Sequence, residues 1–196
     1  MRYGIRSITM DEIATSLGIS KKTIYQFFTD KDELVYAVIE QEIGKDMKEC
    51  ATYRDKAMNA IHEVFLAIED MEELLGYTNP LLLYDLEKYH PRAFQLIKDY
   101  KYQFLYTATL DNLRRGTEEG LYRPGINKDV IAKNRMESAF LVFNPDIFPH
   151  SRYSMSEVNL ELALFFLYGI VTDKGRQLID KYTNDRTKKV SHEQKA

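Results

Sequence analysis

Apolar residues recur at the helical period along almost the whole of this 196-residue chain, and this feature restricts the fold more than any other. The strict alternation of apolar and polar residues that marks a half-buried strand is missing. The 9 glycines and 5 prolines fall mostly between the periodic segments, where they end one helix and precede the next. Hydrophobic residues make up 44% of the chain, which is enough for a sizeable core. We therefore expect an all-α fold.

Three helical patterns open the chain. The first begins at Thr9 with the T-x-x-E spacing of a capping box and ends at Gly18, a residue suited to the left-handed backbone that follows many helices. The second covers residues 21–28 and has Ser20 as its expected N-cap. The third starts near residue 30. Two short helices joined by a turn that contains glycine form the helix-turn-helix pattern.

Longer helical patterns fill the remainder of the chain. We expect helices over residues 56–75, 80–90, 91–119 and 127–143, and a last one from about residue 156 that breaks at Gly169 or Gly175. The tail from Thr183 is polar, and we expect it to be frayed. The pattern predicts two domains: an N-terminal helix-turn-helix domain over 1–48 and a larger helical domain over 49–196.

Composition and motifs exclude several classes of function. The net charge of −3 means that any contact with DNA must come from a local patch. A single cysteine, Cys50, excludes an internal disulfide framework and a cysteine-based zinc site. The longest apolar stretch, near residues 162–171, is far shorter than the ~20 residues that span a bilayer. We find no phosphate-binding loop or catalytic motif, and we expect a cytoplasmic protein that is not an enzyme, needs no cofactor or metal, and does not contact a membrane.

One spacing could belong to a metal site. Glu87 and His90 form an E-x-x-H pair, which is used in di-iron helical bundles. Such a site needs a second copy of the pair and further carboxylates, and the other histidines do not provide that copy. We interpret the pair as a surface ion pair beside a helix end.

The start of the second short helix carries groups that suit DNA. Two ammonium groups and two hydroxyls lie within four consecutive residues, and a phenol and an amide follow on the outer face. These side chains are Ser20, Lys21, Lys22, Thr23, Tyr25 and Gln26. Lys31 lies in the first turn of the next helix, where a lysine is electrostatically unfavourable unless an anion such as a phosphate binds there. Basic and acidic residues balance over 1–34, so charge alone does not favour DNA binding.

The string TIYQFFTDKDEL, residues 23–34, resembles the DNA-binding domain of the TetR family of transcriptional regulators. The resemblance is specific over residues 4–38 and is supported further along by the helix count and the GLYRP turn at 120–124. The matching positions are Gly4, Thr9, Ile13, Ala14, Gly18, Ser20, Tyr25, Phe28, Lys31 and Leu34. The resemblance implies that Thr9, Tyr25 and Lys31 contact phosphates. It also implies that the major groove is faced by Lys21, Lys22, Thr23 and Gln26.

The N-terminus departs from the family pattern. Regulators of this family have a full helix before the position of Gly4, whereas only residues 1–3 precede it here. We expect four apolar side chains to lose part of their cover, at ~25 cal/mol per Å² of exposed apolar surface. They are those of Ile5, Ile8, Val35 and Ile39. An alternative therefore stays open, namely a helical small-molecule-binding or interaction module that does not itself bind DNA.

The larger domain is rich in aromatic and sulfur-containing side chains. Most such residues form the core of any helical protein, but the resemblance implies a small molecule held between these helices. A pocket that combines tyrosines with apolar walls would suit a small hydrophobic effector. The candidate lining residues are Phe65, Met71, Tyr84, Tyr102, Tyr106, Met136, Phe140 and Phe143.

The segment LELALFFLYGIV, residues 160–171, is apolar on nearly all sides and must be covered on several of them. One chain could bury it, but the resemblance points to a homodimer in which this helix and the helix at 127–143 form the interface. The candidate interface residues are Leu160, Leu164, Phe165, Leu167, Tyr168 and Val171. The resemblance thus implies a homodimeric regulator, more often a repressor, that leaves double-stranded operator DNA when its effector binds.

Overall fold

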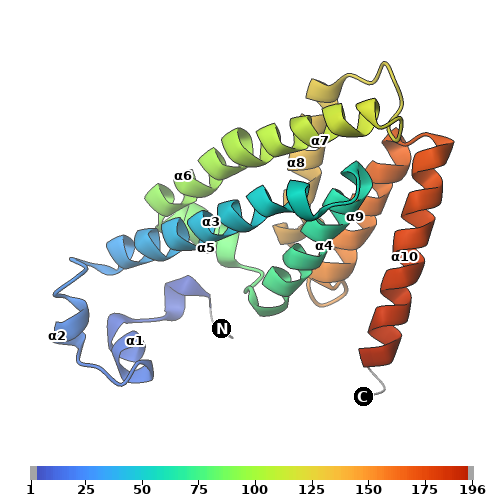
Figure 1. Ribbon diagram of the computed structural model, residues 1–196. Coiled ribbons are helices and arrows are strands. Elements are labelled where there is room, and N and C mark those ends of the chain that lie inside the picture. The colour runs from blue at the N-terminus through green and yellow to red at the C-terminus, as the bar shows by residue number, and fades with distance from the viewer. Residues whose placement is uncertain (1–3, 194–196) are drawn as a thin grey trace.

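The computed structural model describes residues 4–193, with side chains through Lys188. Figure 1 shows a small N-terminal lobe connected by one long helix to a larger helical body. The described residues contain helices and a single isolated bridge, between Tyr122 and Val171, so the all-α prediction is confirmed. The elements are η1 (Ile5–Ser7), α1 (Met10–Ser16), α2 (Lys21–Ile24), α3 (Lys31–Lys56), α4 (Ala60–Tyr77), α5 (Leu82–Tyr89), α6 (Pro91–Asp99), η2 (Tyr100–Leu105), α7 (Tyr106–Glu118), α8 (Lys128–Phe140), η3 (Leu141–Phe143), α9 (Met155–Ile170) and α10 (Asp173–Glu193).

Polar caps explain where many of these helices begin. Both halves of the predicted capping box are present: Glu12 N–H donates to Thr9 Oγ1, and Thr9 N–H donates to Glu12 Oε2. The same kind of side-chain acceptor begins five other helices. Those caps are Ser20, Asp30, Asn59, Asn127 and Ser154.

Several boundaries differ from the sequence-based prediction. The helix α2 ends at Ile24, and the chain continues as a turn to Phe28. The expected helix over 91–119 contains a π-helical segment, η2, between α6 and α7. The break in the last predicted helix falls at residues 171–172. The turn at 120–124 forms backbone hydrogen bonds with this part of the chain and so holds the end of α9 and the start of α10. The tail expected to be frayed is helical to Glu193.

The main core lies between α4, α7, α9 and α10. The fully buried Tyr122 is at its centre, and its hydroxyl donates to Asn112 Oδ1 at 2.9 Å. Its ring lies against Gly116, where a Cβ atom would be 2.1 Å from a ring carbon. The GLYRP turn is therefore a structural junction that fixes the end of α7 against the rest of the body. Among the described residues, no helix is long and apolar enough to cross a membrane.

Candidate nucleic-acid interface

The N-terminal lobe holds α2 on the outside of a small apolar core. Met10 and Ala14 of α1 pack against Ile24 of α2, and Phe28 and Leu34 cover the cluster. Gly18 has a φ of 66°, a left-handed conformation that lets the chain turn sharply between the two helices. Because only Ile24 of α2 is buried, the rest of the helix faces outward (Figure 1). This is the helix-turn-helix arrangement that the sequence predicts.

The two lysines of α2 lie in different environments. Lys21 Nζ is 2.8 Å from Asp11 Oδ2, and this hydrogen bond raises the pKa of Lys21. Lys22 is exposed, and its ammonium group has no partner in the part of the chain that the structure describes. Lys22 is therefore the lysine of this helix that can contact DNA without first giving up a carboxylate.

Some of the hydroxyl groups around these lysines already form hydrogen bonds at the caps of α1 and α2. The hydroxyls of Ser20 and Thr23 are 2.8 Å apart, and Thr9 Oγ1 donates to Glu12 Oε2. Tyr25 is 45% exposed, and Gln26 is exposed. The predicted DNA-contacting residues 20–26 thus lie together on one outer surface, with Thr9 at the start of the preceding helix.

Lys31 does not extend into solvent. Its ammonium donates to the backbone carbonyl of Ile5 at 2.5 Å and lies 3.4 Å from that of Arg6. Desolvation in this position lowers the pKa of Lys31, while Asp85 and Glu12 act in the opposite direction. The carbonyls of η1 therefore provide the electronegative partner for which the sequence suggested a phosphate.

The apolar residues around η1 pack against the larger body of the chain. Ile39 is buried, and Ile5 and Val35 pack with it against Leu86 and Ala93 of the body. Of the four side chains predicted to lose part of their cover, only Ile39 is fully buried, whereas Ile5, Ile8 and Val35 are half-buried.

Polar contacts reinforce the same junction. Arg6 N–H donates to Asp85 Oδ2 at 3.2 Å, and His90 Nδ1 is 2.8 Å from Asp32 Oδ1. Gly4 lies so close that a Cβ atom would be 2.3 Å from Asp85. The partner of His90 is thus Asp32 rather than Glu87, and the described residues contain no group of three potential metal ligands.

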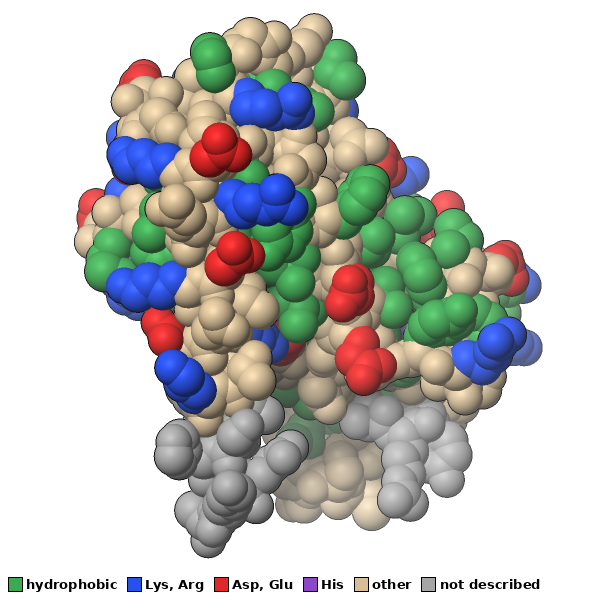
Figure 2. All heavy atoms as spheres, turned by 90° about the vertical axis from the view of Figure 1, so that its right-hand side faces the viewer, with side chains coloured by type: hydrophobic (Ala, Val, Ile, Leu, Met, Phe, Trp, Pro, Cys, Tyr) green, Lys and Arg blue, Asp and Glu red, His purple; other side chains and the backbone are tan. Residues whose placement is uncertain are grey.

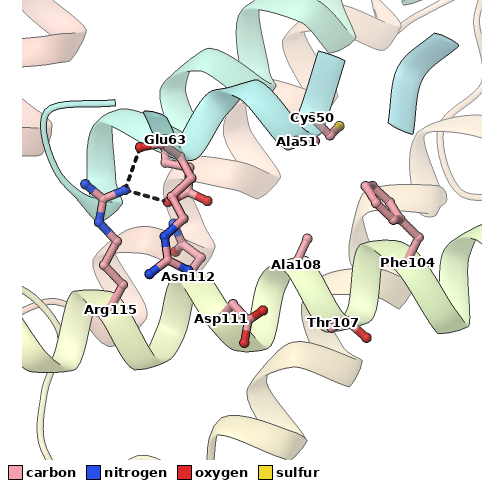
Figure 3. A pocket seen from close by; sticks show the side chains of 10 residues that line it. Cys50, Ala51, Glu63, Phe104, Thr107, Ala108, Asp111, Asn112 and Arg115 are labelled. Atoms are coloured by element: carbon pink, nitrogen blue, oxygen red, sulfur yellow. Dashed lines mark hydrogen bonds and ion pairs between the residues drawn. The ribbon is translucent and has the colours of Figure 1, made fainter. Parts of the chain in front are cut away.

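Two cavities open along α3, on the side that faces α6, η2 and α7. One, of about 230 Å³, includes Cys50, Glu63, Phe104 and Arg115 in its wall, and the other, of about 450 Å³, includes Tyr100 and Phe104. Figure 3 shows the smaller cavity, with Phe104 extending toward the helix that carries Cys50. Phe104 and Thr107 border both cavities, so the two cavities are neighbours, and we refer to them together as the groove along α3.

None of the predicted ligand-lining residues borders these cavities. Phe65 and Met136 are buried in the core, Tyr84 and Tyr102 are about half exposed, and the Tyr106 hydroxyl donates to Asp129. The other three belong to packed clusters: Met71, Phe140 and Phe143. That these residues line an effector site stays a prediction, because the groove has other walls, in which Ile43, Met47 and Phe104 stand among polar side chains.

One half-buried acid, Asp46, contacts two residues of the groove. Tyr100 donates to Asp46, whose pKa is raised by burial, and Cys50 Sγ is 3.7 Å from the same carboxylate. Burial and Asp46 raise the pKa of Cys50 to about 12, so this thiol stays protonated near neutral pH. The π-helical segment η2 carries Tyr100, and such segments are frequent at functional sites. No pattern of residue types indicates this segment in advance.

The candidate dimer face is narrower than we expected. On α9, Phe165 is 81% exposed and Tyr168 is 41% exposed. Leu167 is completely buried in the core of its own chain, so it must be removed from the candidate interface. Leu160, Leu164 and Val171 are half-buried at the margins of the exposed stripe.

An exposed α2 beside a tight turn, mounted on a helical body, defines a helix-turn-helix DNA-binding protein. Residues 1–38 match the family model described as bacterial regulatory proteins, tetR family. The N-terminal lobe of the chain is therefore similar to the DNA-binding domain of TetR-family transcriptional regulators.

Comparison with individual proteins agrees with this assignment. The chain is 28% identical over 170 residues to the uncharacterized HTH-type transcriptional regulator YvaF of Bacillus subtilis, covering 86% of this chain and 88% of that one. The fold is similar to that of a putative transcriptional regulator from Saccharomonospora viridis in complex with choline (TM-score 0.68, 16% identity, 86% and 89% of the two chains). It is also similar to that of FadR from Bacillus subtilis in complex with stearoyl-CoA (TM-score 0.63, 13% identity, 85% and 90%).

Proposed function

We propose that this chain is a homodimeric repressor of the TetR family that binds operator DNA through α2 and is released by a small molecule bound in the larger domain. The observation that carries the DNA-binding part is Lys22, unpaired within the described residues, on an exposed helix flanked by hydroxyl and amide groups. Two such helices related by a two-fold axis would read two half-sites about one helical turn apart. In this account Lys22 and Gln26 face base edges, and Thr9, Ser20, Lys21, Thr23 and Tyr25 surround them.

Lys31 has a positioning role in this proposal. Its bonds to the carbonyls of Ile5 and Arg6 tie η1 to the first turn of α3. A phosphate contact by Lys31 would require the ammonium to exchange these carbonyls for the phosphate. We therefore assign the phosphate contacts to the exposed residues around Lys22 and Gln26, namely Thr9, Ser20, Lys21 and Tyr25.

Fluorescence anisotropy with labelled duplexes from the chromosomal region of the gene tests the DNA-binding proposal. Lys22→Ala should change the order of preference among duplexes, because a base-edge contact is lost. Lys48→Ala removes the same charge from an exposed position in the middle of α3 and serves as the control. We expect Lys48→Ala to keep the wild-type order of preference. If the wild type binds no duplex above the level of random DNA, the alternative of a helical interaction module that does not bind DNA replaces this proposal.

We place the effector in the groove between α3 and the α6–α7 helix. The two cavities together are of the size that small-molecule sites have. The larger one is lined by the carboxylates Glu40 and Asp99 and, among the described residues, by no basic side chain. In the smaller one, Arg54 and Arg115 are accompanied by Glu63 and Asp111, and Arg115 is already paired with Glu63, so the lining as a whole disfavours an anionic ligand. Neighbours of this fold bind molecules as different as choline and stearoyl-CoA. Calorimetric titration with dodecyltrimethylammonium, a cation, and with stearoyl-CoA, an anion, tests this choice of ligand charge. We expect the cation to bind more tightly, and tighter binding of the anion would contradict this placement.

Release requires the effector to distinguish two geometries of the N-terminal lobe. Contacts suited to transmit the difference lie where the body meets the start of α3: the Asp32–His90 pair and the Arg92 guanidinium 5.3 Å from the centre of the Tyr36 ring. A coupling of ~3 kcal/mol would lower operator affinity about a hundredfold.

A further inference from the structure

A single stripe of exposed residues runs along the outer side of α9. Each member lies three or four residues from another member, so they share one face of the helix. They are Glu157, Glu161, Phe165, Tyr168 and Gly169. Figure 2 shows hydrophobic side chains gathered beside the alternating charges of this C-terminal side of the molecule. Phe165, the most exposed large hydrophobic residue of the described chain, lies near the middle of the stripe.

The two ends of the stripe carry opposite charge. Glu157 and Glu161 are exposed, and their carboxylates have no partner among residues 4–188. At the other end, the Arg123 guanidinium donates to the carbonyl of Gly169 and, over the same range, pairs with no carboxylate. Arg176 lies 5.6 Å from the centre of the Tyr168 ring, and the Tyr168 hydroxyl donates to Asp180 behind it. One side of the protruding phenyl ring therefore carries two carboxylates, and the other side, which we call the basic half, carries Arg123 and Arg176 against the single carboxylate of Asp180.

Gly169 is unusual in this position. A glycine inside a helix costs roughly 0.5–1 kcal/mol relative to alanine. Apart from its chain neighbours and the nearby backbone of its own helix, no described atom lies within 4 Å of the place that a Cβ would occupy, so packing within the chain does not require the glycine. The open space over Gly169, one turn beyond Phe165 and beside the Arg123 guanidinium, can instead receive a side chain from another molecule.

We propose that α9 pairs antiparallel with α9 of a second copy about a two-fold axis at Phe165, and that Glu161 of each copy forms an ion pair with Arg123 of the other. An isologous contact brings residue i against residue j and residue j against residue i. With Phe165 on the axis, Glu161 lies four residues to one side and therefore faces Gly169, four residues to the other side. The Arg123 guanidinium is already held at Gly169, so the acidic half of each stripe meets the basic half of its partner.

This pairing rests on the homodimer of the proposed function and specifies its register. A parallel pairing would place the two acidic halves against each other, which is unfavourable for like charges. The self-complementary charge pattern thus selects a second copy of this chain in one orientation as the occupant of the stripe.

Charge reversal tests the register by sedimentation equilibrium of the full chain. Glu161→Arg and Arg123→Glu should each weaken dimerisation roughly tenfold or more, because each places like charges together. The double variant should return the dissociation constant to within a few-fold of the wild type. Glu118→Arg, at an exposed position on α7, is the matched control and should leave the dissociation constant unchanged. Circular dichroism and melting of each variant confirm that it is folded.

Crosslinking provides a second readout that does not depend on charge. In a Cys50→Ser background, Phe165→Cys should form a disulfide dimer on mild oxidation, because a residue on a two-fold axis meets its own copy; Glu118→Cys should not. The register is overturned if the wild type is a dimer but the two charge reversals do not compensate and Phe165→Cys fails to crosslink. That outcome leaves the homodimer intact. A wild type that stays monomeric at all concentrations overturns both the register and the homodimer.

Discussion

Arg135 on α8 is a half-buried cation without a counter-ion in the part of the chain that the structure describes. Its Nη1 atom is sealed from solvent and has no hydrogen-bond partner there, and the guanidinium lies 5.5 Å from the centre of the Phe166 ring. Burial lowers the pKa of Arg135 to about 10, because the charged form loses its hydration. The folded state therefore bears the full cost of this charge at neutral pH, and the cost decreases as pH rises through about 10.

Replacing this charge should stabilise the protein. Arg135→Met keeps a long side chain beside Phe166 and removes the desolvated guanidinium, so we expect the free energy of unfolding to rise by roughly 1–3 kcal/mol at pH 7. Urea denaturation of the two proteins measures the difference. Lys133→Met removes a cation from an exposed position of the same helix, so it provides the comparison and should change stability little. A clear loss of stability in Arg135→Met would show that the guanidinium has a favourable partner in the native state.

Single residues also show where sequence reasoning succeeds and fails. Local chemistry predicted the caps Thr9, Ser20 and Asn127, because a cap acts on the helix that immediately follows it. The partner of Lys31 could not be predicted, since Ile5 is 26 residues away in the chain. Leu167 was assigned to a surface by its apolar neighbours, and only the packing of α9 shows which side of that helix is buried.

At the scale of elements, the turn at 120–124 joins three helices. Thr172 N–H donates to the carbonyl of Leu121 at 2.9 Å, and Arg123 N–H donates to that of Ile170 at 2.8 Å. Gly116 lets the Tyr122 ring lie directly on α7. The helices α7, α9 and α10 are therefore fixed at one point, and this turn explains why the last break in the chain falls at residues 171–172.

We expect Gly116→Ala to lower the free energy of unfolding by roughly 2–3 kcal/mol, because its methyl group would overlap the buried Tyr122 ring. Gly44→Ala in α3 has no described atom within 4 Å of the new Cβ and should instead stabilise the chain by about 0.5–1 kcal/mol. Guanidinium unfolding measures both. Equal effects of the two substitutions would contradict the role given to this contact.

At this same scale, the sequence predicted the helices better than their surfaces. Apolar periodicity identified the helical segments and the two-helix N-terminal motif. The groove along α3 was not predicted, because its walls come from residues near 50 and near 104 that only the tertiary fold brings together. The π-helical segment η2 also depends on packing and has no signature in residue type.

The whole molecule connects an exposed helix at one end with a groove and an outer stripe in its body. The contacts of Asp85 with Arg6 and of Asp32 with His90 join the N-terminal lobe to α5 and α6, so a change in the body can reach α2. Pairing at α9 would place two such lobes in one symmetric assembly. Symmetry is therefore what would allow one short helix, with its exposed Lys22, to select a DNA sequence.

Selection from a pool of random duplexes by the wild-type protein, followed by sequencing of the bound fraction, tests this claim most directly. The account predicts enrichment of a two-fold symmetric site with half-sites about one helical turn apart, and Lys22→Ala in the same selection should alter the enriched bases within each half-site. Recovery of sequences without symmetry, or no enrichment above the starting pool, would contradict it.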